Sequence, residues 1–212
     1  MSDTTATQAH EHGGHEMHRD DLGRKMGMWL FLFTELLLFG GLFVLYMSYR
    51  VEYSLDFSIA AKELQVPMGT LNTIILLTSS LTMVLSIVAL QRKNKKLSLT
   101  FLGMTQIFAL GFLVVKFFEW SAKISHGIYP SGPELLGKPN GEIVFYGLYY
   151  AMTGLHGFHV IVGMIILGFM MVMVYNDKIT PEKFVLLENG GLYWHLVDLI
   201  WIFLFPLFYL LH

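Results

Sequence analysis

Two side chains of different chemistry lie three residues apart in the last apolar segment of the chain. His195 and Asp198 belong to the stretch LYWHLVDLIWIFLFPLFYL at residues 192–210, which carries no charged residue besides Asp198. Residues three apart share one face of a helix, so the imidazole and the carboxylate can interact there. An acid inside a membrane-length apolar segment is costly unless it is paired or shielded. We therefore expect this face to pack against protein, as a functional or interface site.

Two further acids belong to other apolar segments. Glu35 lies inside the first one, and a rise of about 1.5 Å per residue places it near the centre of a bilayer. Such a carboxyl must be protonated or hydrogen-bonded. It is either a proton-coupled or structural acid that faces a partner subunit, or a neutral acid bonded within its own bundle. Glu119 follows Lys116 by three residues at the end of the third segment, which favours a simple interfacial ion pair.

The fourth apolar segment contains a patch of small and polar residues, Thr153, Gly154, His156, Gly157 and His159. Its glycines would allow a neighbouring helix to approach closely. The two histidines share a face and could ligate a metal or a haem, but a haem-copper centre needs histidines from several helices. The apolar segments hold only one more. Hydrogen bonding between helices is the favoured interpretation.

The composition predicts a membrane protein, because 54% of the 212 residues are hydrophobic and only 14% are charged. A helix needs roughly 20 apolar residues to cross a bilayer. Five segments satisfy this requirement, at residues 26–46, 71–90, 97–115, 143–174 and 192–211. The predicted fold class is all-α, a polytopic bundle of five transmembrane helices.

The distribution of Lys and Arg predicts the orientation, since basic residues are enriched in cytoplasmic loops. Nine basic residues flank one side of the predicted membrane domain and four flank the other. The nine are Arg19, Arg24, Lys25, Arg92, Lys93, Lys95, Lys96, Lys178 and Lys183, and the four are Arg50, Lys62, Lys123 and Lys138. We therefore expect a cytoplasmic N-terminus and a C-terminus outside.

The first 24 residues differ from the rest of the chain. They include His10, His12, His15 and His18, which could chelate a transition metal, but Gly13 and Gly14 favour a flexible, solvated cytoplasmic tail. No metal site is assigned there, and residues 25–212 form the predicted membrane domain. The first apolar segment is too long, and lacks the cleavage site, for a removed signal peptide.

Several classes of chemistry are excluded by composition. The chain has no cysteine, which removes disulfides, iron–sulfur ligation, c-type haem attachment and a dithiolate copper centre. The net charge is −2 and no basic cluster alternates with aromatic residues in a polar region, so nucleic acid is not an expected partner.

Five stretches together resemble subunit III of the haem-copper oxidases, the family of cytochrome c oxidase and the related quinol oxidases. These are WLFLFTELLLFGGLF around Glu35, LNT at residues 71–73, Glu119 after the third segment, TGLHGFHVIVG at residues 153–163, and ENGGLYWHLVDLIWIFLFPLFYL from Glu188. They touch all five segments and cover nearly everything after residue 24. Longer family members have seven helices, and this chain resembles their last five, as in the short bacterial forms.

The resemblance implies a noncatalytic subunit of a proton-pumping terminal respiratory oxidase in the bacterial cytoplasmic (inner) membrane. It implies that haems and copper belong to partner subunits, that this chain carries no redox cofactor, and that it supports the catalytic subunit, proton uptake and phospholipid binding. Subunit I is the expected direct partner, followed by subunit II, other oxidase or supercomplex subunits, and lipids. Glu35 corresponds to the family's buried membrane acid. The other positions treated as structural or proton-related are Glu119, His156, His159, His195 and Asp198.

Two other functions remain open at this point. One is the related accessory membrane subunit of a nitric oxide reductase, which shares the helical pattern. The other is a haem b membrane protein that uses His156 or His159 together with His195. The choice between cytochrome c and quinol as electron donor depends on a site in another subunit.

Overall fold

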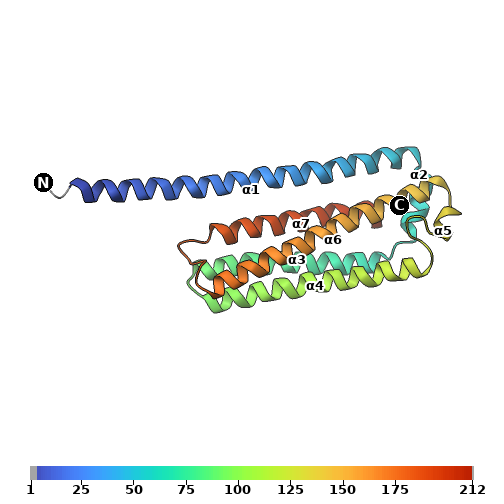
Figure 1. The fold of residues 1–212 in the computed structure, drawn as a ribbon. Coiled ribbons are helices and arrows are strands. Elements are labelled where there is room, and N and C mark those ends of the chain that lie inside the picture. Colours follow the sequence, from blue (N-terminus) through green and yellow to red (C-terminus); the bar gives the residue numbers. More distant parts are fainter. Residues whose placement is uncertain (1–3, 212) are drawn as a thin grey trace. The chain divides into compact units, whose positions relative to one another are not determined.

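The computed structural model describes the backbone of residues 4–211 and the side chains of residues 22–211. This part of the chain forms helices and no strand (Figure 1). The chain divides into two compact units, residues 1–37 and 38–212. The helices are α1 (Thr4–Glu52), α2 (Ser54–Lys62), α3 (Val66–Gln91), α4 (Lys95–Ser125), α5 (Pro133–Leu136), α6 (Asn140–Tyr175) and α7 (Val185–Tyr209).

The first unit is the N-terminal part of α1. This helix begins at Thr4, so the backbone of the histidine-rich tail is helical up to the apolar part, which starts at Leu22. The side chains of His10, His12, His15 and His18 lie outside the described ones. The division into a flexible tail and a membrane domain at residue 25 remains a prediction.

The second unit is built around four long helices that run side by side (Figure 1). α3 packs against α4 and α7, and α6 packs against the same two helices, which closes a ring of four. Short connections at residues 92–94 and 176–184 make the consecutive helices antiparallel. α2 packs on α6 and α7, and α5 packs on α6. The ring positions polar residues of α4, α6 and α7 opposite one another.

Within the residues that the structure describes, five helices are long and apolar enough to cross a membrane, which confirms the predicted fold class. They are Leu22–Glu52, Val66–Gln91, Lys95–Ser125, Asn140–Tyr175 and Val185–Tyr209. Most of them extend beyond the predicted apolar segments because polar residues continue the helices at their ends. The cytoplasmic position of the N-terminus and the external position of the C-terminus remain predictions.

For α4, hydropathy alone predicts a helix end that lies too early in the chain. Its buried residues follow an alternating spacing of four and three: Ser98, Leu102, Thr105, Ala109, Phe112, Lys116, Glu119 and Lys123. This heptad-like spacing keeps one side of the helix against its neighbours over its whole length. The charged residues that close the apolar segment therefore continue the packing face into the bundle.

Candidate functional site

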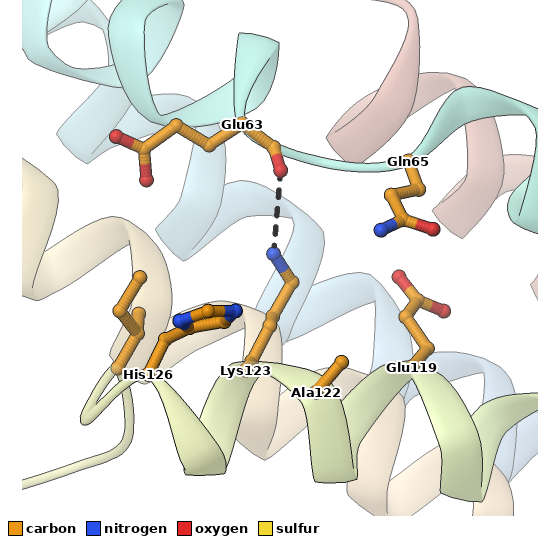
Figure 2. A pocket seen from close by; sticks show the side chains of 7 residues that line it. Glu63, Gln65, Glu119, Ala122, Lys123 and His126 are labelled. Carbon is orange, nitrogen blue, oxygen red and sulfur yellow. Dashed lines mark hydrogen bonds between the residues drawn. The ribbon is translucent and has the colours of Figure 1, made fainter.

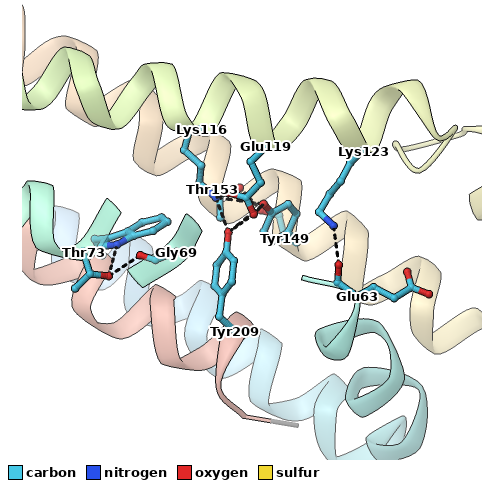
Figure 3. A network of polar contacts seen from close by, with 10 residues as sticks. Glu63, Gly69, Thr73, Lys116, Glu119, Lys123, Tyr149, Thr153 and Tyr209 are labelled. Carbon is cyan, nitrogen blue, oxygen red and sulfur yellow. Dashed lines mark hydrogen bonds and ion pairs between the residues drawn. The ribbon is translucent and has the colours of Figure 1, made fainter. Parts of the chain in front are cut away.

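A buried polar cluster joins α4, α6 and α7 at the level of Lys116 (Figure 3). The Lys116 ammonium donates to Glu119 Oε2 at 3.0 Å, to the Tyr149 hydroxyl at 3.2 Å and to the Tyr209 hydroxyl at 2.8 Å. The two tyrosine hydroxyls donate to Glu119 Oε1, at 2.8 Å from Tyr149 and at 2.5 Å from Tyr209. The cluster therefore connects three helices through one lysine, one glutamate and two tyrosines.

The environment of this cluster compensates for the removal of two charges from water. The Lys116 and Glu119 side chains are only 9% and 2% exposed. The ammonium also lies 5.0 Å from the ring centroids of Tyr149 and Trp201 and 5.4 Å from that of Tyr209, where aromatic faces attract a cation. The expected ion pair is thus present, but a simple interfacial pair was the wrong description. The tyrosines of two later helices enclose it.

A small polar pocket adjoins the cluster at the end where α4 terminates (Figure 2). Its volume is about 150 Å³, which is room for several water molecules. Gln65 and Glu119 point into it from opposite sides, and Lys123 donates to the backbone carbonyl of Glu63 at 3.5 Å across it. The pocket gives Glu119 a polar neighbourhood on the side away from Lys116.

A second ionic cluster near this pocket joins the connections that follow α2 and α5 to the beginning of α6. Lys138 donates to Glu63 Oε1 at 2.8 Å and to Glu142 Oε2 at 2.7 Å, and the Tyr146 hydroxyl donates to Glu63 Oε2 at 2.5 Å. Partial burial alone would raise the pKa of Glu63, but the hydrogen bonds from Lys138 and Tyr146 outweigh burial, so the pKa is lowered. Burial would likewise lower the pKa of Lys138, but Glu142 and Glu63 raise it. Both groups are therefore held in their charged forms.

His195 and Asp198 meet at a serine rather than directly. The Ser80 hydroxyl of α3 lies 2.6 Å from His195 Nδ1. The Asp198 carboxyl lies near the same serine, and neither of its oxygens has a hydrogen-bond partner among residues 22–211. The expected packing of this face of α7 against protein is observed, since Asp198 is buried.

The histidines of α6 pack against aromatic rings. His156 is fully buried with its ring 5.5 Å from that of Phe112 and 5.3 Å from that of Trp201, and within the described side chains neither of its nitrogens has a hydrogen-bond partner. His159 Nδ1 bonds the backbone carbonyl of Leu155 in its own helix. Hydrogen bonding between helices was therefore the wrong expectation for the ring of His156, which packs between the rings of Phe112 and Trp201 instead.

The two glycines of the same patch differ in how much space surrounds them. A Cβ at Gly154 would lie 3.1 Å from the Trp120 ring, so this glycine permits close approach of α4 and α6. A Cβ at Gly157 would meet nothing within 4 Å. The expected close helix contact is thus made at Gly154 and not at Gly157.

Glu35, the remaining candidate, lies on α1 in the first unit and is partly exposed.

The sequence alone does not single out Tyr149, Tyr209 and Ser80, which complete the two polar groups. Tyrosine and serine are ordinary residues in an apolar segment, and only the three-dimensional arrangement brings them to Glu119 and His195. Thr73 of the LNT stretch makes a separate contact between α3 and α7, since its hydroxyl accepts a hydrogen bond from Trp201 Nε1 at 3.0 Å; the bond is drawn in Figure 3. Within residues 22–211, no group of three or more His, Cys, Asp or Glu side chains could hold a metal ion.

Comparisons with known proteins agree on one family. The profile of the family described as cytochrome c oxidase subunit III matches residues 3–212. The chain is 32% identical to a cytochrome c oxidase subunit 3 from Bacillus sp. PS3 and 30% identical to a cytochrome bo(3) ubiquinol oxidase subunit 3 from Pseudomonas putida. Each of these alignments covers 88% of this chain and 84% of the relative.

The name of a longer relative combines two subunits. The heme-copper oxidase subunit I+III of Aeropyrum pernix is 31% identical over 88% of this chain, which corresponds to 22% of that protein. The profile match and these similarities, on a fold with five apolar helices, show that this chain belongs to the cytochrome c oxidase subunit III family of haem-copper oxidases.

Proposed function

We propose that this chain is a noncatalytic subunit III that binds no haem or copper itself and supports the catalytic subunit of a respiratory oxidase in the bacterial cytoplasmic membrane. The observation that carries the proposal is the set of contacts that the buried polar groups make. Lys116 and Glu119 bind each other and two tyrosines, and His156 packs among aromatic rings. A redox site would need several ligands aimed at one point, whereas these side chains hold helices together.

Subunit I is the proposed direct partner. The Aeropyrum pernix relative is named as subunits I and III in one chain, which supports adjacency of the two in an assembled complex. The outward sides of the bundle suit such an assembly, since only 28% of the most apolar window of α4, and 28% of that of α6, is buried inside the chain. Subunit II and further oxidase or supercomplex subunits are proposed as more distant partners.

The intramembrane polar residues are assigned supporting roles in this proposal. Glu35 carries either a proton-related or a structural role in sustained turnover, and His195 with Asp198 fixes α7 against α3 through Ser80. Glu119, His156 and His159 hold α4, α6 and α7 together.

Purification in a mild detergent tests the proposal. The affinity-tagged chain should copurify with a large haem-bearing subunit, and the chain expressed alone should contain no stoichiometric haem or copper by metal analysis and visible absorbance. A Soret band in the isolated chain would favour the haem b alternative. Copurification with a nitric oxide reductase would favour the accessory-subunit alternative.

A further inference from the structure

The polar pocket at the end of α4 contains a lysine that has no carboxylate of its own. Lys123 is only 9% exposed and points from α4 into the pocket (Figure 2). An ammonium has three N–H donors, and the only hydrogen bond of Lys123 among residues 22–211 is the 3.5 Å contact with the Glu63 carbonyl. Such bonds are normally about 2.7–3.2 Å long, so this contact is weak. The other donors of a buried cation are left without an acceptor in this part of the chain.

The neighbouring acids do not satisfy Lys123, because each of them is paired with a different lysine. Glu119 is bound by Lys116 at 3.0 Å, and Glu63 is bound by Lys138 at 2.8 Å. Lys123 itself forms no ion pair within the described side chains. A buried charge without a partner is costly. The pocket therefore favours a ligand that brings a negative charge to Lys123.

The lining of the pocket restricts what this ligand can be. Glu63 and Glu119 both line it, so an anion with two charges, such as sulfate, would be repelled. The volume of about 150 Å³ is enough for a few water molecules and for a small anion, but not for a large one. The Gln65 amide and the His126 imidazole can each donate or accept, whereas the Glu119 carboxylate can only accept. The lining thus fits a small monovalent anion that has both acceptor oxygens and a hydroxyl donor.

We propose that this pocket binds one bicarbonate ion. Its oxygens accept hydrogen bonds from Lys123 and from the Gln65 amide, and its hydroxyl donates to the Glu119 carboxylate. Chloride and formate match the single charge but have no donor for this carboxylate. All the lining residues belong to this chain, so the inference does not depend on the proposed function or on an oxidase partner.

Equilibrium dialysis with radiolabelled bicarbonate tests this site on the purified protein, together with whichever subunits accompany it. The dialysis cell is sealed and kept at mildly alkaline pH, where bicarbonate is the main form of dissolved carbon dioxide. The parent should bind one ion per chain in a saturable manner. Unlabelled bicarbonate should displace the label at lower concentration than chloride, formate or sulfate does.

Three variants identify the groups that hold the ion. Lys123→Met should weaken binding by more than about tenfold, the effect of one charge-assisted hydrogen bond, and Gln65→Leu should weaken it about two- to tenfold. Lys62→Met is the matched control, since it removes an exposed positive charge of α2 that does not line the pocket, and it should bind like the parent. Without bicarbonate, the unfolding midpoint of Lys123→Met should equal or exceed that of the parent, because an unpaired buried charge is removed.

The absence of saturable binding by the parent, or equal binding by the parent and a folded Lys123→Met, would overturn the proposal. Displacement by sulfate as effective as that by bicarbonate would also overturn it, because the pocket would then be a general anion site. Trapping with trimethyloxonium followed by mass spectrometry provides a last check. A carboxylated Lys123 would contradict the proposal, because carbon dioxide would then have reacted with the amine to form a carbamate.

Discussion

Lys116 and Glu119 differ from the surface ion pairs of this chain in how completely they are withdrawn from solvent. Lys95 and Asp177 form a 2.6 Å pair, but their side chains are 36% and 73% exposed, against 9% and 2% for Lys116 and Glu119. An exposed pair contributes about 0–1 kcal/mol. Removing one partner of a buried pair costs about 3–5 kcal/mol, because the other charge stays buried without compensation.

Lys116→Met should therefore destabilise the protein by about 3 kcal/mol, since Glu119 loses its ion-pair partner. The double variant Lys116→Met with Glu119→Gln should recover part of this loss, because no buried charge remains. The measurement is the thermal unfolding midpoint of the purified protein in detergent.

Lys95→Met is the matched control, and its midpoint should stay close to that of the parent because its ion pair is exposed. Equal effects of Lys95→Met and Lys116→Met would contradict the importance of burial. A double variant less stable than Lys116→Met would show that the tyrosines need the carboxylate itself.

The Glu63 and Lys138 cluster gives the stability a defined pH dependence. The pKa of Glu63 is below its usual 4.5, so its contribution is present above pH 4.5 and is lost as the pH falls through the lowered value. The pKa of Lys138 is above 10.5, so its contribution is present below pH 10.5 and is lost as the pH rises through the raised value. Both contributions are complete at neutral pH.

Glu63→Gln should thus lower the unfolding midpoint at neutral pH and reduce the further drop that the parent shows below pH 4.5. The measurement is the unfolding midpoint of the parent and of Glu63→Gln over an acidic pH series. If the unfolding midpoints of the two proteins fell in parallel with pH, Glu63 would not determine the loss of stability in acid.

At the scale of elements, Gly163 allows α6 and α7 to approach each other closely. A Cβ at Gly163 would lie 2.8 Å from the Trp194 ring and 3.2 Å from that of Tyr193. Trp194 is fully buried, and its Nε1 donates to Ser79 of α3 at 3.1 Å. The ring therefore cannot move away without losing this bond.

Gly163→Ala should destabilise the protein by about 1–3 kcal/mol, the usual cost of overpacking a core. Gly147→Ala should instead be neutral or stabilising by about 0.5–1 kcal/mol, because alanine is the better helix former and the site is open. Unfolding midpoints should move in opposite directions in the two variants. A stabilised Gly163→Ala would show that Trp194 has room to shift.

The all-α class and the number of membrane-length helices could be predicted from the sequence because apolar length decides both, whereas the short helices α2 and α5 were not predicted. The helix ends could not, since Lys116, Glu119 and Lys123 end an apolar run while they continue the buried face of α4. The candidate acid Glu119 could be found by its cost in a membrane. Its partners Tyr149 and Tyr209 could not be found in this way, because they are far from Glu119 along the chain and reach it only after folding.

For the whole molecule, the predicted orientation of the chain in the membrane can be tested directly. The excess of basic residues on one side predicts that reporters fused after Lys96 are active in the cytoplasm and that reporters fused after His212 are active outside. An odd number of spans after a cytoplasmic N-terminus requires opposite sides for the two termini. Activity of both fusions on the same side would remove one span from this topology.

The Lys116 cluster also has a consequence for biosynthesis. The chain is made from its N-terminus, so α4 enters the membrane carrying Lys116 and Glu119, which can neutralise each other within one helix. Tyr149 arrives with α6, and Tyr209 arrives only with the last turn of α7. Until then the Glu119 carboxylate lacks one of its hydrogen-bond donors. A chain that ended before Tyr209 would therefore leave Lys116 and Glu119 without this hydroxyl, so the buried cluster is complete only when the last turn of α7 is made.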